Sequence, residues 1–188
     1  MRKLKLQMQI SINGFVTTDD KDETNFKFRD DEITNFDIEN LKNTDCILFG
    51  KNLAEYFIPR WATVANNPKD NNYKLGQLLT EIPKVVFSKT LKVSKWDNTT
   101  IANGDIAEEI KKLKKKKGKD IIVYGGYSFV SSLIRHGLID EYYLLVNPVA
   151  VGSGQPIFKS LTSNLQLTFK KREPFTCGTV LLCYTGQK

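Results

Sequence analysis

A strand, two glycines, a helix and a second strand follow one another in the later half of the chain, and this pattern limits the possible folds most. Residues 121–124 (IIVY) are apolar and mostly β-branched, a run long enough for a buried strand and too short for a helix. After Gly125 and Gly126, apolar side chains at helical spacing predict a helix over residues 127–136. Residues 142–146 predict the next strand. This order is typical of a crossover unit, which joins two parallel strands.

The paired glycines lie where an open sheet of this kind binds phosphate, at the carboxyl end of a strand and the amino end of a helix. Free backbone N–H groups and the helix dipole both attract an anion at such a point. The dinucleotide pattern G-x-G-x-x-G does not occur in this sequence. Because glycine is also used wherever the backbone bends sharply, a tight turn without a ligand is the alternative.

Helices and strands alternate along most of the remaining chain, which predicts an α/β fold with a mainly parallel sheet flanked by helices. The last two strands, at 165–171 and 179–184, are joined by a turn and are expected to form an antiparallel addition. Residues 15–29 are polar without a period and predict a loop, and Pro59 is expected to end a short helix at 53–57. Further strands are predicted at 4–12, 46–49, 84–87 and within 96–102, and further helices at 31–43, 73–80 and 106–117.

Glycine and polar residues follow the ends of three predicted strands. Because the carboxyl ends of parallel strands share one edge of the sheet, we expect these segments to converge on one ligand. Their ammonium, hydroxyl and backbone N–H groups are donors, which suits an anionic ligand with several phosphates. The segments are Gly50-Lys51-Asn52, Ser88-Lys89-Thr90, and Gly125-Gly126 with Ser128.

Two acidic residues of the helix predicted at 31–43 are candidates for chemistry with a substrate. Asp31 is expected to face the cleft, where it could anchor a nitrogenous ring or relay a proton, and helix capping is its alternative role. Asp37 is the second candidate. His136 is the single histidine and is expected to be structural, because the motifs H-E-x-x-H and G-x-S-x-G are both missing. Neither a metal site nor a Ser-His-Asp triad is therefore expected.

The net charge of +7 is concentrated in one segment. Seven of the 28 basic residues are lysines between positions 111 and 119, and the other 21 balance the 21 acidic residues. A solvated helix face is the expected role of these lysines, and binding of RNA or DNA is the rival. The aromatic side chains that would stack on bases do not occur among them, so no nucleic-acid partner is expected.

The composition favours a single cytoplasmic domain over residues 1–188. Hydrophobic residues make up 40% and charged residues 26% of the chain, values typical of a globular protein that buries a core. There is no apolar run of signal-peptide or membrane-spanning length, so no membrane partner is expected. Cys46, Cys177 and Cys183 have no C-x-x-C spacing and are expected to be reduced thiols.

Four segments together resemble a known family. These are residues 11–14 (SING), 44–51 (TDCILFGK), 83–91 (PKVVFSKTL) and 121–158, of which the last two are the more specific. The chain is similar over nearly its whole length to the dihydrofolate-reductase-like proteins. Within them it most resembles the reductase domain of the riboflavin-pathway deaminase–reductase and its stand-alone relatives.

The resemblance implies an NADPH-dependent reductase of a small heterocyclic substrate, from the pyrimidine-ribityl or pterin class, and a possible homodimer. It places Lys51, Ser88 and Lys89 near the adenosine phosphate end of NADPH. It also implies a cis peptide bond between the paired glycines. The residues that it assigns to the pyrophosphate are Gly125, Gly126, Tyr127, Ser128, Phe129 and Val130.

The chain departs from the family pattern at residues that bear on function. Asn13 replaces an aspartate, and Lys51 and Lys89 replace arginines. The resemblance puts Asn13 and Phe15 on the substrate side and makes Asp31 only an approximate match to the acid of dihydrofolate reductases. A protein that binds NADP(H) in this fold without turnover is therefore the alternative to a reductase.

Overall fold

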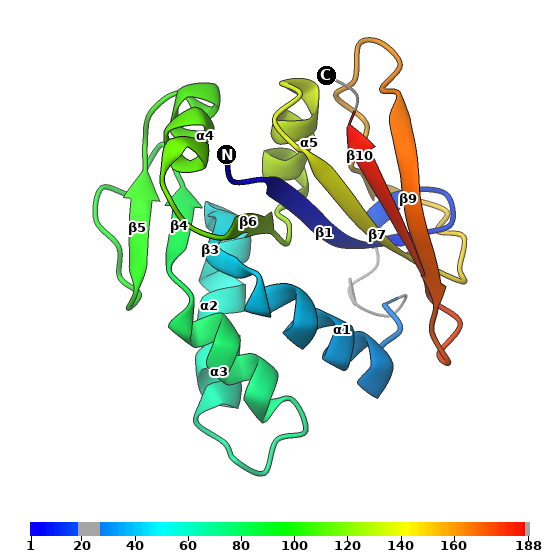
Figure 1. Cartoon of the computed structure of the whole chain (residues 1–188), viewed down its shortest axis with the longest axis horizontal. Helices are drawn as coiled ribbons and strands as arrows, with labels where there is room; N and C mark the ends of the chain where they lie inside the picture. The colour runs from blue at the N-terminus through cyan, green and yellow to red at the C-terminus, as the bar shows by residue number, and fades with distance from the viewer. Residues whose placement is uncertain (19–26, 187–188) are drawn as a thin grey trace.

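The computed structural model describes residues 1–18 and 27–186, and its centre is an eight-stranded sheet (Figure 1). The strand order is β5-β4-β3-β6-β1-β7-β10-β9, in which all neighbours from β5 to β7 are parallel. β10 is antiparallel to both β7 and β9, so the predicted architecture is confirmed. The strands are β1 (Leu4–Ser11), β3 (Thr44–Gly50), β4 (Lys84–Phe87), β5 (Thr99–Ala102), β6 (Asp120–Val123), β7 (Glu141–Asn147), β9 (Leu167–Pro174) and β10 (Val180–Gly186).

Helices cover both faces of the sheet (Figure 1). One face carries α1, α2 and α3, and the opposite face carries α4 and α5. All five helices begin within two residues of a predicted helix start. Their bounds are α1 (Asp31–Lys42), α2 (Lys51–Ala65), α3 (Tyr73–Glu81), α4 (Ile106–Lys115) and α5 (Tyr127–Arg135).

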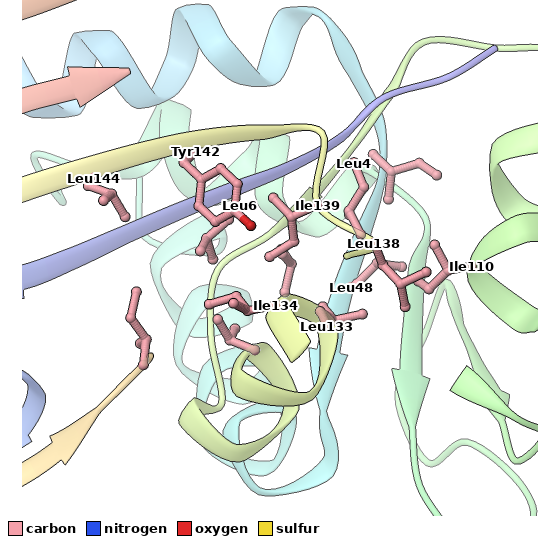
Figure 2. Close-up of a cluster of buried hydrophobic side chains, with 14 of the residues drawn as sticks. Leu4, Leu6, Leu48, Ile110, Leu133, Ile134, Leu138, Ile139, Tyr142 and Leu144 are labelled. Carbon is pink, nitrogen blue, oxygen red and sulfur yellow. The ribbon is translucent and has the colours of Figure 1, made fainter. Parts of the chain in front are cut away.

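Alternation along the strands explains how one sheet serves two sets of helices, because successive side chains point to opposite faces. In β3, Leu48 belongs to the core cluster beneath α4 and α5, whereas Ile47 and Phe49 belong to the cluster beneath α2 and α3. Figure 2 shows the first cluster, which includes Leu48 of β3 and Leu133 of α5. Fully buried strands of this kind are expected in a parallel sheet covered on both faces.

The prediction that Pro59 ends a short helix is wrong. α2 continues from Lys51 to Ala65 with Pro59 inside it. A proline removes one helical hydrogen bond, and Pro59 lies on the exposed side of α2, while Ala54 and Ile58 are buried. Close packing against α3 supports the last turn, since a Cβ added to Gly76 would lie 2.9 Å from the backbone nitrogen of Ala65. Tertiary packing therefore outweighs the local effect of the proline.

The loop predicted at residues 15–29 is also partly wrong. Its first residues form β2 (Phe15–Thr18), which pairs antiparallel with β8 (Gly154–Pro156) in a small second sheet. The two strands are far apart in sequence, so local pattern could not reveal the pairing. Residues 19–26 of the predicted loop lie outside the described residues.

Three further observations bear on the sequence expectations. Within residues 1–18 and 27–186, no helix is both long and apolar enough to span a membrane. The thiols of Cys46 and Cys183 are free and buried, and that of Cys177 is free and half-buried. The helix predicted at 106–117 ends slightly earlier, at Lys115.

Candidate functional site

A groove of about 690 Å³ runs along the carboxyl ends of β3, β4 and β5 and over the start of α5. We call it the glycine groove. It brings together the three segments that were predicted to converge at this edge of the sheet. The predicted residues that line it are Gly50, Lys51, Asn52, Ser88, Lys89, Thr90, Gly126, Ser128 and Phe129.

Two helices point their amino ends at the glycine groove. Gly50 is the N-cap residue of α2 and Gly126 is the N-cap residue of α5, and neither helix has a side-chain cap. A Cβ added to Gly126 would lie 3.6 Å from the backbone nitrogen of Gly50, so the two helix ends are adjacent. The first N–H groups of a helix need partners from outside it, and the helix dipole favours an anion there. This arrangement fits phosphate groups.

Glycine is required at this junction for two physical reasons. Gly126 has φ +82° and Gly125 has φ +151°, which disfavour any side chain. Gly50 has a different constraint, because a Cβ there would lie 2.9 Å from Cβ of Phe129. The Gly125–Gly126 peptide bond is trans, so the implied cis bond is a wrong prediction. Positive φ angles make this turn instead.

Basic side chains surround the groove. Lys51, Lys89 and Arg135 all line it, and Nζ of Lys51 donates to Oγ1 of Thr90 at 3.2 Å. Asp105 also lines the groove, but its carboxylate accepts hydrogen bonds from two backbone N–H groups at the start of α4. The groove therefore presents more positive than negative charge, which suits a ligand with several phosphates.

Three of the residues predicted to bind pyrophosphate do not line the groove. The side chain of Tyr127 is 43% exposed, and Val130 is fully buried in the core beneath α5. Gly125 lies behind the groove, where an added Cβ would be 3.2 Å from Cδ2 of Leu53 and from Cε of Met8. Of the segment 125–130, positions 126, 128 and 129 thus face the groove.

A second cavity of about 450 Å³ adjoins the groove, and Leu53 lines both. We call it the aromatic cavity. It lies between the sheet and the helices α1, α2 and α3, and Phe57 and Trp61 of α2 form part of its wall. The ring of Phe57 stacks on that of Tyr124, with centroids 5.8 Å apart and an interplanar angle of 19°. A flat, partly apolar ligand fits such a wall.

The sheet contributes a polar floor to the aromatic cavity. Gln7 and Gln9 of β1 lie two residues apart and so point to the same face of the sheet. β1 and β6 pair in parallel with Leu6 opposite Val123, which puts Tyr124 on that face as well, beside Gln7. All three polar side chains line the cavity.

Asp37 of α1 is the buried acid of the aromatic cavity, with 5% of its surface exposed. Its carboxylate accepts hydrogen bonds from Nε2 of Gln7 and from a guanidinium nitrogen of Arg29, the latter at 2.7 Å. Nδ2 of Asn40 donates to Oε1 of Gln7 at 2.6 Å and so fixes the orientation of that amide. Burial raises the pKa of Asp37 despite these two partners.

Asp31 does not reach either cavity. Its side chain is exposed and lines a separate depression with Thr34 and Pro68. The N-cap of α1 is Asp30, which accepts a hydrogen bond from the backbone N–H of Ile33 at 2.8 Å. The expected cleft-facing orientation of Asp31 is therefore wrong, and the structure brings the second candidate, Asp37, to the site.

The two predicted substrate residues, Asn13 and Phe15, also lie outside both cavities. Nδ2 of Asn13 donates to the backbone carbonyl of Val151 at 2.8 Å, and Oδ1 of Asn13 accepts from the backbone N–H of Val151 at 3.1 Å. Phe15 begins β2 and pairs with Pro156. In this chain the turn after β1 is thus tied to the loop before β8.

Sequence reasoning missed several residues that line the two cavities. Gln7 and Gln9 interrupt the apolar positions of a buried strand, which is a signal that could have found them. The end of β5, Asn103-Gly104-Asp105, repeats the glycine and polar pattern of the other strand ends. Nothing local in the sequence marks Arg29 or Arg135, because only the fold brings them to the site.

Comparisons with known proteins agree with this architecture. The family model of the RibD C-terminal domain matches residues 2–181. The uncharacterized protein YyaP of Bacillus subtilis (strain 168) is 32% identical over 187 residues, which cover 97% of this chain and 94% of YyaP.

Two solved structures show the same fold at low sequence identity. A putative riboflavin biosynthesis protein from Shewanella sp. PV-4 superposes with a TM-score of 0.67 at 16% identity, and each chain covers 100% of the other. A diaminohydroxyphosphoribosylaminopyrimidine deaminase/5-amino-6-(5-phosphoribosylamino)uracil reductase from Thermotoga maritima gives a TM-score of 0.70 at 15% identity, over 99% of this chain and 57% of that one. With the family match over nearly all of its length, the chain belongs to the RibD C-terminal domain family, which has the dihydrofolate-reductase-like fold.

Proposed function

We propose that this protein is an NADPH-dependent reductase of a small planar nitrogen heterocycle of the pyrimidine or pterin class. The observation that carries the proposal is the junction of the two cavities. A basic groove with two uncapped helix ends opens beside an aromatic cavity with a buried acid, and Leu53 lines both. A dinucleotide in the groove and a ring in the cavity would meet at this point.

The groove residues fit the phosphates of NADPH. The adjacent backbone N–H groups at the starts of α2 and α5 would hold the pyrophosphate, in the space that Gly126 leaves open. Lys51, Lys89 and Arg135 supply the positive charge that a further phosphate on the adenosine ribose requires. When bound, the cofactor supplies a hydride at its nicotinamide ring.

The residues of the aromatic cavity would orient the substrate for that hydride. Asp37 would accept a hydrogen bond from a ring nitrogen or an amino group and is the acid through which a proton can reach the ring. Phe57 and Trp61 would cover the ring faces and exclude water. The name of the Thermotoga protein includes a 5-amino-6-(5-phosphoribosylamino)uracil reductase, which supports a substituted pyrimidine as the first substrate to test.

Thermal unfolding with added dinucleotide tests the cofactor. A ligand at 100 times its dissociation constant stabilises the folded state by about 2.7 kcal/mol, so NADPH should raise the melting temperature, and more than NADH does. The Lys89→Gln variant should lose most of this preference while keeping the melting temperature of the free protein. The absence of a shift with either dinucleotide at millimolar concentration would contradict the proposal.

A binding protein without turnover is the second candidate, because Asn13 stands where the family has an aspartate and is engaged with Val151. NADPH oxidation measured over a panel of pterins and of phosphoribosylamino-pyrimidines, the class named for the Thermotoga protein, separates the two candidates. Binding of NADPH with no oxidation by any member of the panel would favour the second. Oxidation that Asp37→Asn slows would favour the reductase.

The lysine segment gives little support to nucleic-acid binding. Lys111 and Lys112 pair with Glu108 and Glu109, at 3.1 and 2.9 Å. Lys114 is buried, with 9% of its side chain exposed, and pairs with Asp140. The pairs of Lys111 and Lys112 agree with the expected role of a solvated helix face, and the buried Lys114 anchors the end of α4.

A further inference from the structure

We infer that Gln9 and Tyr124 are the residues that recognise the ring of the substrate, with Oε1 of Gln9 accepting from a ring N–H and the Tyr124 hydroxyl donating to a neighbouring ring carbonyl. The ligand class is thus a heterocycle with a cyclic-amide edge. This inference rests on the proposed function, because it concerns the substrate of the same site.

The first observation is that these two polar atoms lack a hydrogen-bond partner among residues 1–18 and 27–186. Oε1 of Gln9 and the hydroxyl of Tyr124 are buried and form no hydrogen bond with the residues that the structure describes. A buried polar group without a partner costs about 1–3 kcal/mol, so such groups are rare unless something else binds them. Both side chains line the aromatic cavity, which is where a ligand would satisfy them.

The second observation is that the other polar groups of the cavity are already engaged. Gln7 uses its amide nitrogen on Asp37 and its amide oxygen on Asn40. Arg29 donates to Asp37. The charged and amide groups around α1 therefore hold one another in place. Among the described residues that line the cavity, Oε1 of Gln9 and the hydroxyl of Tyr124 are the buried side-chain atoms without a hydrogen-bond partner.

The sheet fixes these two side chains on one surface. Gln9 lies two residues beyond Gln7 along β1 and so points to the same face of the sheet. Tyr124 directly follows the neighbouring strand β6 and lies beside Gln7 on that face. Both side chains therefore lie on the face of the sheet that forms the floor of the aromatic cavity, and the ring of Phe57 stacks on that of Tyr124. Gln9 lies within β1 and Tyr124 directly follows β6, and positions on or next to strands hold donors and acceptors more accurately than loops do.

The protonation of Tyr124 is consistent with its role as a donor. Burial, and then the charge of Asp37, raise the pKa of its phenol well above the ordinary value. The hydroxyl therefore keeps its proton over the physiological range and can donate to a carbonyl. A site built to bond a polar edge also discriminates strongly against analogues that lack it, because its own groups would be left unpaired.

Two probes test the assignment directly by calorimetry on the full chain, without cofactor. The first is 5,6-diaminouracil, which has ring N–H and carbonyl groups, and the second is 1,3-dimethyl-5,6-diaminouracil, which keeps the carbonyls and lacks the ring N–H groups. Wild type should bind the first probe roughly tenfold more tightly than the second. Tyr124→Phe and Gln9→Met should each weaken binding of the first probe by roughly tenfold.

The second probe separates the two roles. Gln9→Met should bind it at least as well as wild type does, because no ring N–H is left to lose, whereas Tyr124→Phe should still weaken it. Tyr56→Phe is the matched control, since the hydroxyl of Tyr56 already accepts from Arg60 at 2.6 Å and the residue is 56% exposed. It should change neither affinity by more than about twofold.

Folding and cofactor binding are read separately from recognition. Tyr124→Phe and Gln9→Met remove unpaired buried atoms, so their melting temperatures should equal or exceed that of wild type, and both should bind NADPH normally. Wild-type affinity for 5,6-diaminouracil in both variants, or no binding of this probe to wild type, would overturn the inference. Probe binding with the expected pattern but no NADPH binding would leave the inference standing and defeat the proposed cofactor.

Discussion

Asp37 is the residue whose protonation is coupled most directly to the site. The fold removes this carboxyl from water, and burial raises its pKa although Arg29 and Gln7 both favour the charged form. A raised pKa means that the folded state binds the proton more tightly than the unfolded chain does. The contribution of Asp37 to stability is therefore complete below its ordinary pKa of 3.8 and is lost as the pH rises through the raised value.

The Asp37→Asn variant should reveal this linkage. Its side chain does not titrate, so its free energy of unfolding should rise relative to that of wild type as the pH increases from about 4 to about 7. Urea unfolding at several pH values measures the difference. A difference that is constant with pH, or that moves in favour of wild type, would contradict the raised pKa.

The choice between Asp31 and Asp37 shows what could be read from the sequence at this scale. Ile33, Asp37 and Leu41 are the buried residues of α1, and their spacing of four puts them on one face of the helix. The apolar stripe was visible in the sequence, so it could have favoured Asp37. The partners Arg29 and Gln7 were not predictable, because they reach Asp37 from a loop and from a strand.

The elements themselves were predictable where the hydrophobic period was strong. Most strands and the helices at Asp31–Lys42, Tyr73–Glu81 and Tyr127–Arg135 begin and end close to their predicted bounds. α2 was underestimated because Pro59 is locally a helix breaker, and its continuation depends on packing against α3. The pair of β2 and β8 was missed for a related reason, since each short strand is defined by its distant partner.

The two glycines that flank α5 allow a matched test of the glycine groove. Gly126 at its start and Gly137 just beyond its end both have positive φ, +82° and +61°. Alanine at either position should cost about 1–2 kcal/mol of stability for the same conformational reason. A Cβ at position 126 would enter the space next to the backbone nitrogen of Gly50, whereas one at position 137 would meet nothing within 4 Å.

Gly126→Ala should therefore weaken NADPH binding by roughly tenfold or more, and Gly137→Ala should leave it unchanged. Fluorescence titration with NADPH measures the affinity, and urea unfolding measures the cost to stability. Equal affinities of the two variants for NADPH would show that Gly126 is needed only for the conformation of the backbone turn. That result would restore the alternative of a tight turn without a ligand.

Two separate groups of basic residues bear on the electrostatics of the whole molecule. The lysines between positions 111 and 119 account for the net excess, yet they lie on and after α4, and several are paired with acids. The cations of the glycine groove, Lys51, Lys89 and Arg135, are fewer but line a concave site. A concave site concentrates the electric field of a few charges. The position of the basic residues should therefore matter more for the affinity for NADPH than their number does.

Two multiple variants can separate these groups. Lys51→Gln with Lys89→Gln should raise the dissociation constant of NADPH roughly tenfold and bring it close to that of NADH, because the groove loses two phosphate-binding charges. Lys115→Gln with Lys116→Gln and Lys117→Gln removes three charges from the other group and should leave the affinity for NADPH and its salt dependence unchanged. Titrations at low and high salt provide both quantities. The contrary outcome is that wild type binds RNA with a steep salt dependence and the triple variant loses it. The lysines between positions 111 and 119 would then form a nucleic-acid-binding surface, against the expectation stated for them.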